Sequence, residues 1–281
     1  MSPHAALHSN ILLIYAIFTC FLLIMAPLLI LCVQRFMHRD VSHAWASYRG
    51  WLLMLPIIGC CIFLGRVPTI LFLTLVAVVG LKEFARATGL YEDWVMMGVL
   101  YASLLSISAI SIVPDPNAHT PGWYGLFMAL PVYVIAAILV VPIVRNRSKD
   151  QVQSIALAIL GFIYIGWMFG HLIFLANSKH AYGYLLFLLF AVSVNDVAAF
   201  TFGRLFGKRK LRSKISPGKT IEGAVGALVV AMLLPWLLHF SFPHFTTMNC
   251  LLAGVIVGIG GQLGDLSISV IKRDLGIKDM G

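Results

Sequence analysis

The chain has 281 residues, of which 60% are apolar and 11% are charged, and its formal net charge is +9. A soluble domain carries about 25% charged residues, so this composition excludes one water-soluble globular domain and indicates a lipid bilayer as the solvent. In a membrane protein, excess positive charge indicates anionic headgroups or cytoplasmic anchoring rather than nucleic acid. The five cysteines lie in or beside apolar runs without CxxC spacing, which argues against disulfides and thiolate-bound metals.

Nine apolar runs qualify as membrane spans, for which about 20 residues are needed unless partners shield the ends. In chain order they cover roughly 11–33, 51–65, 67–81, 95–113, 123–143, 153–176, 181–202, 224–240 and 250–271. We therefore predict an all-α integral membrane protein with a single polytopic domain over 1–281. The second and third runs are short and meet at Arg66-Val67-Pro68, which leaves open a broken re-entrant unit over 51–81.

The positions of the Lys and Arg residues predict the orientation. With the N-terminus outside, all of them except Arg66 and Lys179 fall in segments on the inside, as the positive-inside rule requires. We therefore expect the N-terminus outside, the C-terminus inside and a basic cytoplasmic loop at 203–223. A re-entrant unit would move the N-terminus inside and leave the C-terminal half unchanged.

Two acidic residues, Asp196 and Asp265, lie well inside apolar runs, where charges are costly and usually functional. Both spans run from outside to inside, and both residues precede the next basic residue by about two turns of helix. Their carboxylates should therefore lie at one depth, just below the cytoplasmic surface. A divalent cation would relieve their repulsion, and Mg²⁺ prefers oxygen ligands. The alternative is that each Asp pairs separately with a basic residue, in a structural or transport role.

The predicted loop at 203–223 contains seven basic residues with glycines interleaved among them. Ser216-Pro217 matches a helix N-cap followed by Pro at the first helical position, and a helix N-terminus flanked by lysines suits a phosphate. We expect Arg204 and Lys219 to contact phosphate, and 208–210 mainly to anchor the chain at the membrane surface. Simple positive-inside anchoring of the whole loop is the alternative.

The last span places Asp265, Ser269 and Lys272 at i, i+4 and i+7, which is one helix face, and Arg273 follows directly. Glycines in the same span should allow another helix backbone to approach closely. They are Gly258, Gly260, Gly261 and Gly264.

Three segments resemble the phosphatidate cytidylyltransferase family. They are NDVAAFTFGRLFGK at 195–208, SPGKTIEG at 216–223 and GDLSISVIKR at 264–273. The last of them continues into Lys278-Asp279, so that Ser269 to Asp279 fits the family pattern S-x-x-K-R-x-x-x-x-K-D. The matched motifs cover roughly 195–281, and the rest of the chain resembles the family only in its run of spans.

The resemblance implies transfer from CTP to phosphatidic acid, giving CDP-diacylglycerol and pyrophosphate, with Mg²⁺ as cofactor. It implies a multi-pass protein of the bacterial inner membrane with its site facing the cytoplasm. The expected partners are CTP, phosphatidic acid and the lipid bilayer, without nucleic acid, and a homodimer is left open. The expected catalytic residues are Asp196, Asp265, Lys272 and Arg273, of which the two Asp residues bind the metal. The expected substrate-binding residues are Arg204, Ser216, Lys219, Thr220, Glu222, Ser269, Lys278 and Asp279.

Two further expectations concern activity. The family pattern continues beyond Asp279 into His-Gly-Gly and Asp-Arg-x-Asp, and without that segment we expect a correctly inserted bundle with weak or absent turnover. The alternatives are a non-catalytic relative that binds lipid or a partner, and an ion or lipid transporter that uses the buried Asp residues. The sequence has no detectable internal repeat, which argues against the transporter.

Overall fold

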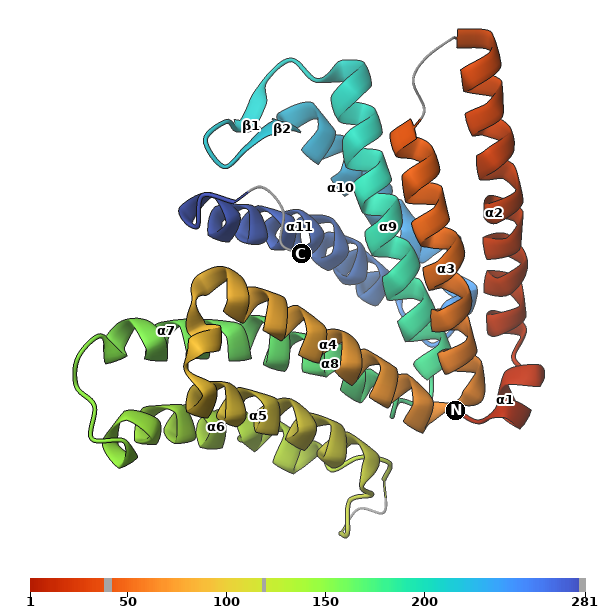
Figure 1. Ribbon diagram of the computed structural model, residues 1–281. Coiled ribbons are helices and arrows are strands. Elements are labelled where there is room, and N and C mark those ends of the chain that lie inside the picture. Colours follow the sequence, from red (N-terminus) through yellow and green to blue (C-terminus); the bar gives the residue numbers. More distant parts are fainter. Residues whose placement is uncertain (38–41, 118–119, 278–281) are drawn as a thin grey trace.

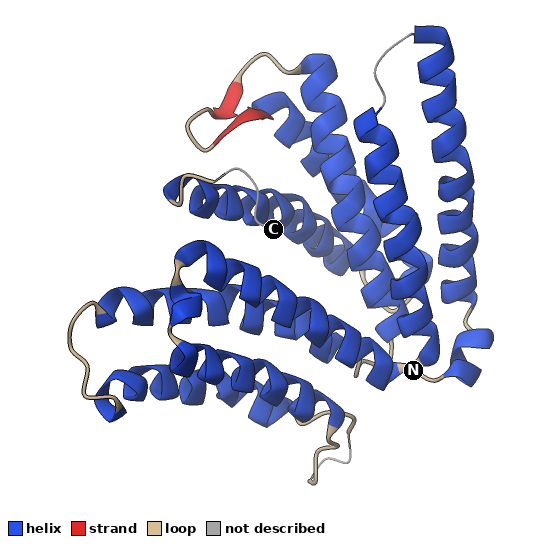
Figure 2. Cartoon of the chain, in the orientation of Figure 1, coloured by secondary structure: helices blue, strands red, loops and turns tan. Residues whose placement is uncertain are grey.

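The computed structural model describes residues 1–37, 42–117 and 120–277, and this part of the chain is mostly helical (Figures 1 and 2). The first elements are α1 (Pro3–Leu7), α2 (Asn10–Met37), α3 (Ser42–Leu64), α4 (Arg66–Thr88), η1 (Leu90–Glu92), α5 (Trp94–Ile112) and α6 (Tyr124–Val144). They are followed by α7 (Gln151–Gly161), η2 (Phe162–Met168), α8 (Phe169–Leu175), α9 (Ala181–Phe206), β1 (Lys210–Arg212), β2 (Ser216–Thr220), α10 (Ile221–Leu237), η3 (His239–Ser241) and α11 (Thr247–Asp274).

Each predicted span coincides with helical structure. Seven helical segments among the described residues are long and apolar enough to cross a membrane, and two shorter apolar helices, Tyr48–Leu64 and Ile221–Leu237, cover the other two predicted spans. The chain is therefore mostly helical, as a multi-pass membrane protein should be. The count of nine crossings and their orientation stay predictions. The all-α prediction needs one correction, because β1 and β2 form a two-stranded antiparallel sheet.

The two short predicted spans are separate helices that meet at Gly65. Gly65 has φ +116°, a backbone conformation that residues with a side chain rarely adopt. Pro68 lies in the first turn of α4, where its missing N–H breaks no helical hydrogen bond. Helix α4 then continues past the predicted end at 81 to Thr88 and ends at Gly89 in the left-handed conformation.

The sixth predicted span is a continuous helical segment with an unusual middle. Helix α7 runs directly into the π-helix η2 and then into α8, together covering Gln151–Leu175. A π-helix is rare and frequently lies at a functional site. From this π-helix the hydroxyl of Tyr164 donates a hydrogen bond of 2.9 Å to the carbonyl oxygen of Gly264 in α11.

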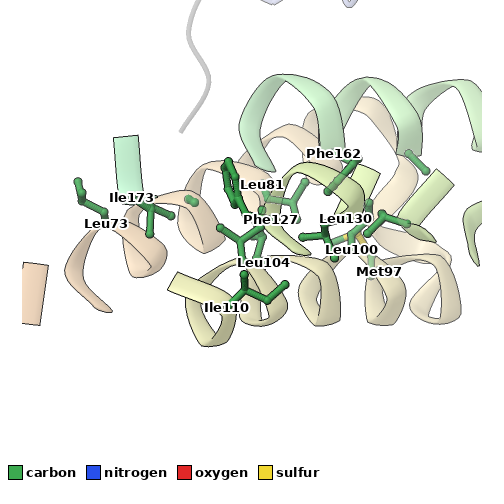
Figure 3. Close-up of a cluster of buried hydrophobic side chains, with 14 of the residues drawn as sticks. Leu73, Leu81, Met97, Leu100, Leu104, Ile110, Phe127, Leu130, Phe162 and Ile173 are labelled. Atoms are coloured by element: carbon green, nitrogen blue, oxygen red, sulfur yellow. The ribbon is translucent and has the colours of Figure 1, made fainter. Parts of the chain in front are cut away.

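Two hydrophobic cores hold the helices together. The larger core is formed mainly by α4 to α8, and Figure 3 shows its apolar side chains pointing toward one another. Within it the ring of Phe127 stacks on Trp167 and Phe174, with centroids 4.5 and 4.7 Å away. The smaller core lies between α9, α10, the segment that follows η3, and α11. Because lipid is as apolar as these side chains, close packing rather than water exclusion holds such helices together.

Small residues bring the C-terminal helices close together. A Cβ atom at Gly254 would lie 2.6 Å from the Cα of Met232, and one at Gly258 would lie 2.7 Å from the Leu228 side chain. The predicted close approach is therefore confirmed at Gly258. It is wrong at Gly260, where nothing would lie within 4 Å, because that residue faces away from the other helices.

A partly buried ion pair joins the ends of α5 and α6. Asp93 is the N-cap of α5, where its side chain accepts a 3.1 Å hydrogen bond from the Met96 N–H, and it also pairs with Arg145 at the end of α6. The two side chains are only 15% and 17% exposed. One carboxylate therefore caps one helix and neutralises the arginine of the next.

We expect Asp93→Ala to lower the free energy of unfolding by about 2–4 kcal/mol, because it removes the cap and leaves Arg145 unpaired. Asp93→Asn should cost less, because asparagine still caps the helix. Thermal unfolding in detergent should therefore rank the wild type above Asp93→Asn, and Asp93→Asn above Asp93→Ala. Equal losses in the two variants would show that the cap contributes nothing.

Candidate active site

The basic segment after α9 folds into a β-hairpin between two helices. Strands β1 and β2 pair antiparallel, with Lys210 opposite Thr220 and Arg212 opposite Ser216. Helix α9 continues to Phe206, so the predicted loop at 203–223 begins and ends in helix. Figure 1 shows the hairpin at one end of α9 and α10.

The predicted helix start at Ser216-Pro217 is wrong, because these residues lie in β2. The N-cap of α10 is Thr220, whose hydroxyl accepts a 3.1 Å hydrogen bond from the Gly223 N–H. Both edges of a two-stranded sheet are open, so a proline without an N–H is tolerated in β2. The N-cap of this helix therefore lies four residues later in the chain than predicted.

Glycines bring the base of the hairpin against α9. A Cβ atom at Gly223 would lie 2.6 Å from the Ala199 carbonyl oxygen and 3.0 Å from the Cα of Gly203. One at Gly207 would lie 2.8 Å from the methyl carbon of Thr220. These contacts fix the start of α10, and with it the hairpin, against the C-terminal turns of α9.

Glu222 closes the base of the hairpin. Its carboxylate accepts hydrogen bonds from the backbone N–H groups of Lys208 and Arg209, at 3.1 and 3.2 Å, and from Nε of Arg209 at 3.2 Å. The Ile221 N–H donates a further bond of 2.9 Å to the carbonyl oxygen of Arg209. Glu222 thus ties the chain entering the hairpin to the chain leaving it.

These contacts predict that Glu222→Ala acts on the hairpin rather than on a ligand. We expect cleavage by trypsin after the exposed hairpin residues Lys210 and Arg212 to accelerate, with little change in the thermal stability of the helices. Glu222→Gln should lie between, since its amide oxygen still accepts one or two of the backbone bonds. A cleavage rate unchanged in Glu222→Ala would contradict this role.

A pocket of about 580 Å³ lies between the hairpin, α9, α10 and α11. Polar side chains line it from three of these elements. They are Asp196 and Arg204 from α9, Ser216, Lys219 and Thr220 from β2, and Gln262 and Asp265 from α11, and the small residues Gly203, Gly218, Gly223 and Ala224 complete this part of the wall. The apolar lining is Ala199, Phe200 and Leu211. A pocket of this size accommodates a small molecule such as a nucleotide.

Two contacts cross from the hairpin to α11. The ammonium group of Lys219 pairs with the Asp265 carboxylate, and the side chains are 25% and 56% exposed. Near the other end of the hairpin, Nε of Arg273 donates a 3.2 Å hydrogen bond to the carbonyl oxygen of Ile215. The hairpin is therefore attached to α11 at both points.

The donor set of the pocket fits a magnesium ion. Mg²⁺ prefers oxygen ligands and usually takes only one or two carboxylates from the protein, the rest being water and phosphate. Asp196 and Asp265 are two such carboxylates, and the Lys219 ammonium already stands as a positive group at one of them. The described residues contain no group of three or more His, Cys, Asp or Glu side chains that could enclose a metal alone.

The structure brings together six of the sequence-predicted site residues. Those that line the pocket are Asp196, Arg204, Ser216, Lys219, Thr220 and Asp265. Four others lie elsewhere in the described chain: Glu222 at the hairpin base, Arg273 on the hairpin backbone, Lys272 near the end of α11, and Ser269, whose hydroxyl donates to the Asp265 carbonyl oxygen at 2.8 Å. Lys278 and Asp279 lie outside the described residues.

Three further polar residues near the pocket carried no separate role in the sequence. Gln262 lines the pocket and donates a 2.8 Å hydrogen bond to the Ala224 carbonyl oxygen. Asn195 is only 1% exposed, and its side-chain atoms have no hydrogen-bond partner among the described residues. Tyr164 contacts the residue before Asp265. A polar side chain inside an apolar run was the available signal for each.

Comparisons with known proteins identify the family to which the chain is related. A profile of the cytidylyltransferase family matches residues 45–281. The phosphatidate cytidylyltransferase of Staphylococcus haemolyticus (strain JCSC1435) is 30% identical over 231 residues, which cover 82% of this chain and 84% of that protein. The enzyme of the same name from Staphylococcus aureus (strain COL) is 28% identical over 219 residues, covering 77% and 80%.

A further relative is the uncharacterized protein YnbB of Escherichia coli (strain K12), which is 28% identical over 223 residues covering 77% of this chain and 70% of that protein. The family match extends from within α3 through the hairpin to the end of the sequence, so it includes every residue that lines the pocket. The resemblance seen in the sequence motifs is thus confirmed. This chain belongs to the cytidylyltransferase family.

Proposed function

We propose that this protein transfers the cytidylyl group of CTP to phosphatidic acid, giving CDP-diacylglycerol and pyrophosphate. The observation that carries the proposal is one pocket, at the end of apolar helices, lined by Asp196, Asp265, Lys219 and Arg204. Relatives named phosphatidate cytidylyltransferase over most of the chain support the same substrates.

In the proposed reaction, a phosphate oxygen of phosphatidic acid attacks the α-phosphorus of CTP. The new oxygen–phosphorus bond forms as the bond from the α-phosphorus to the bridging oxygen of the β-phosphate breaks. Pyrophosphate leaves with the electron pair of that bond. Such a transfer depends on positioning and on neutralising phosphate charge more than on covalent chemistry by the protein.

The residues of the pocket suit these two tasks. Asp196 and Asp265 would hold Mg²⁺, which when bound supplies positive charge to the phosphate oxygens. Lys219 and Arg204 would bind phosphate, the lysine as a mobile point charge and the arginine as a planar fork. Gly218 and Gly223 present backbone without side chains at the pocket wall, which leaves room for phosphate groups.

The apolar side of the pocket suits a lipid phosphate. Phe200 lines the pocket, is 66% exposed, and its ring centroid lies 6.0 Å from the guanidinium carbon of Arg204. An exposed aromatic ring beside a cation offers an apolar surface to acyl chains and a charge to the phosphate they carry. We assign the lipid headgroup to this side and the nucleotide to the side of Lys219.

The proposed membrane arrangement follows from the charges. We propose nine crossings with the N-terminus outside, and the hairpin and pocket facing the cytoplasm of a bacterial inner membrane, where CTP is available. The distribution of Lys and Arg residues supports this orientation. A homodimer stays a prediction.

The test is turnover by the purified protein in detergent micelles. With CTP, phosphatidic acid and Mg²⁺, CDP-diacylglycerol should form together with an equal amount of pyrophosphate, and EDTA should stop the reaction. Omission of phosphatidic acid controls for CTP hydrolysis. Pyrophosphate release without the lipid, or lipid product unaffected by EDTA, would contradict the proposal.

A further inference from the structure

The ion pair between Lys219 and Asp265 creates a competition inside the pocket. Lys219 comes from β2 and Asp265 from the middle of α11, and the two groups meet with Asp196 in the same lining. A lysine can donate hydrogen bonds but cannot accept them. With its ammonium on Asp265, Lys219 occupies part of the carboxylate that a metal ion would use, and it supplies no ligand to that ion.

We propose that Lys219 is an internal counterion that a divalent cation displaces from Asp265, and that the displaced ammonium then binds a phosphate of the nucleotide. This inference rests on the function proposed above and deepens it. It gives Lys219 two alternative partners, Asp265 without ligands and a phosphate group with them.

The charges support an exchange rather than simultaneous binding. A divalent cation about 2.1 Å from a carboxylate oxygen would repel an ammonium group on the same carboxylate. Asp265 is 56% exposed, so a hydrated ion can reach it from solvent. Lysine has a flexible stem of four carbons, so its charged group can leave Asp265 without a backbone movement.

The hairpin can stay in place while the lysine moves. Its base is held by the bonds of Glu222 to Lys208 and Arg209, and its turn is held by Arg273 on the carbonyl oxygen of Ile215. None of these contacts involves Lys219. The exchange is therefore a side-chain event, and the ammonium group is released inside the same pocket.

Such an exchange couples the cation and the nucleotide. Without nucleotide, Lys219 weakens cation binding, because it must be displaced. With nucleotide bound, a phosphate group pairs with the released ammonium, so Lys219 no longer competes with the cation for Asp265. By linkage, each ligand must then strengthen the binding of the other by the same factor.

The first test measures Mn²⁺ affinity without nucleotide, by electron paramagnetic resonance of the free ion in detergent. We expect Lys219→Met to bind Mn²⁺ about tenfold more tightly than the wild type, because one opposing charge is removed. Lys210→Met removes an equal charge from the neighbouring strand and should leave the affinity nearly unchanged. Asp265→Asn should weaken Mn²⁺ binding both in the wild type and in the Lys219→Met variant. Lys219→Gln is the second variant, should methionine impair folding.

The outcomes separate the two proposals. If Asp265→Asn weakens Mn²⁺ binding but Lys219→Met does not strengthen it, the exchange is wrong and the metal site stands. Equal strengthening by Lys219→Met and Lys210→Met would reduce the effect to general surface charge, and also overturns the exchange. If Asp265→Asn leaves Mn²⁺ affinity unchanged, the metal site of the proposed function is itself wrong.

A second measurement uses the unaltered protein. Acetylation of lysines by acetic anhydride, read by mass spectrometry, should become faster at Lys219 when Mg²⁺ is added, because its ammonium loses a carboxylate partner. Lys210 serves as the internal reference and should not change. Adding CTP with Mg²⁺ should protect Lys219 again. Labelling of Lys219 that Mg²⁺ leaves unchanged or slows would contradict the exchange.

Discussion

Replacing Asp265 by Asn is expected to lower Mg²⁺-dependent CTP turnover by about a hundredfold or more, with little effect on folding. A metal supplies several kcal/mol of charge stabilisation to a phosphoryl transfer, and each 1.4 kcal/mol corresponds to about tenfold in rate. The Asp265 side chain is 56% exposed and that of Lys219 25%, and ion pairs near the surface typically contribute about 0–1 kcal/mol to stability. Catalysis and folding should therefore separate in this variant.

The matched control is Asp274→Asn, which removes an exposed carboxylate from the end of the same helix, away from the pocket lining. It should retain nearly full turnover. Both variants should be compared by melting temperature in the same detergent and by initial rate over a range of Mg²⁺ concentrations. Rates that fall equally in the two variants would show that α11 needs negative charge in general, and no metal ligand at Asp265.

Gly223→Ala is expected to lower both stability and turnover, although it touches no charged group. Its Cβ would lie 2.6 Å from the Ala199 carbonyl oxygen and 3.0 Å from the Cα of Gly203, both of them backbone atoms that cannot rotate away. Overpacking of this kind costs about 1–3 kcal/mol. The start of α10 would have to move away from α9, which separates Lys219 from Asp196 and Arg204.

Gly260→Ala is the control, because it adds the same methyl group at a helix position where the new Cβ atom would have no neighbour within 4 Å. Alanine is a better helix former than glycine by about 0.5–1 kcal/mol, so this variant should be as stable as the wild type or slightly more so. A Gly223→Ala protein that melts with the wild type and keeps its turnover would contradict the tight contact between α9 and α10.

Composition and the positions of single charged residues predicted the helices of this protein and most of the residues that line its pocket. Every predicted span coincides with a helix, because about 20 consecutive apolar residues leave few alternatives in a bilayer. Asp196 and Asp265 stood out because charge inside such runs is costly, and the structure places both in one pocket. Lys219 and Arg204 were selected for their basic charge beside glycines, and they line that pocket too.

The features that could not be predicted from the sequence depend on contacts between distant parts of the chain. Ser216-Pro217 has the residues of a helix start, but pairing with Arg212 places Ser216 in a strand. Glu222 was expected to bind substrate, which stays a prediction, and spacing gave no sign that its carboxylate accepts hydrogen bonds from backbone N–H groups thirteen and fourteen residues earlier. Sequence spacing could not place Tyr164, in a π-helix, against Gly264, a hundred residues further on.

The sequence also could not predict which anionic group pairs with Lys219. Lys219 was assigned to phosphate from its charge, the expected helix N-terminus and its place in the SPGKTIEG motif, whereas the structure pairs it with Asp265. Both partners are anionic, and nothing in the spacing of residues ranks them. The competition between them follows only from the geometry of the pocket.

The most direct test of the central claim is an experimental structure with CTP and Mn²⁺, in which the anomalous signal of manganese locates the cation. A single ion should lie in the pocket between α9 and α11, with carboxylate oxygens of both Asp196 and Asp265 about 2.1 Å away and the triphosphate beside Lys219. The account would be contradicted by carboxylates more than about 10 Å apart with the ion on only one of them, or by a nucleotide bound outside this pocket.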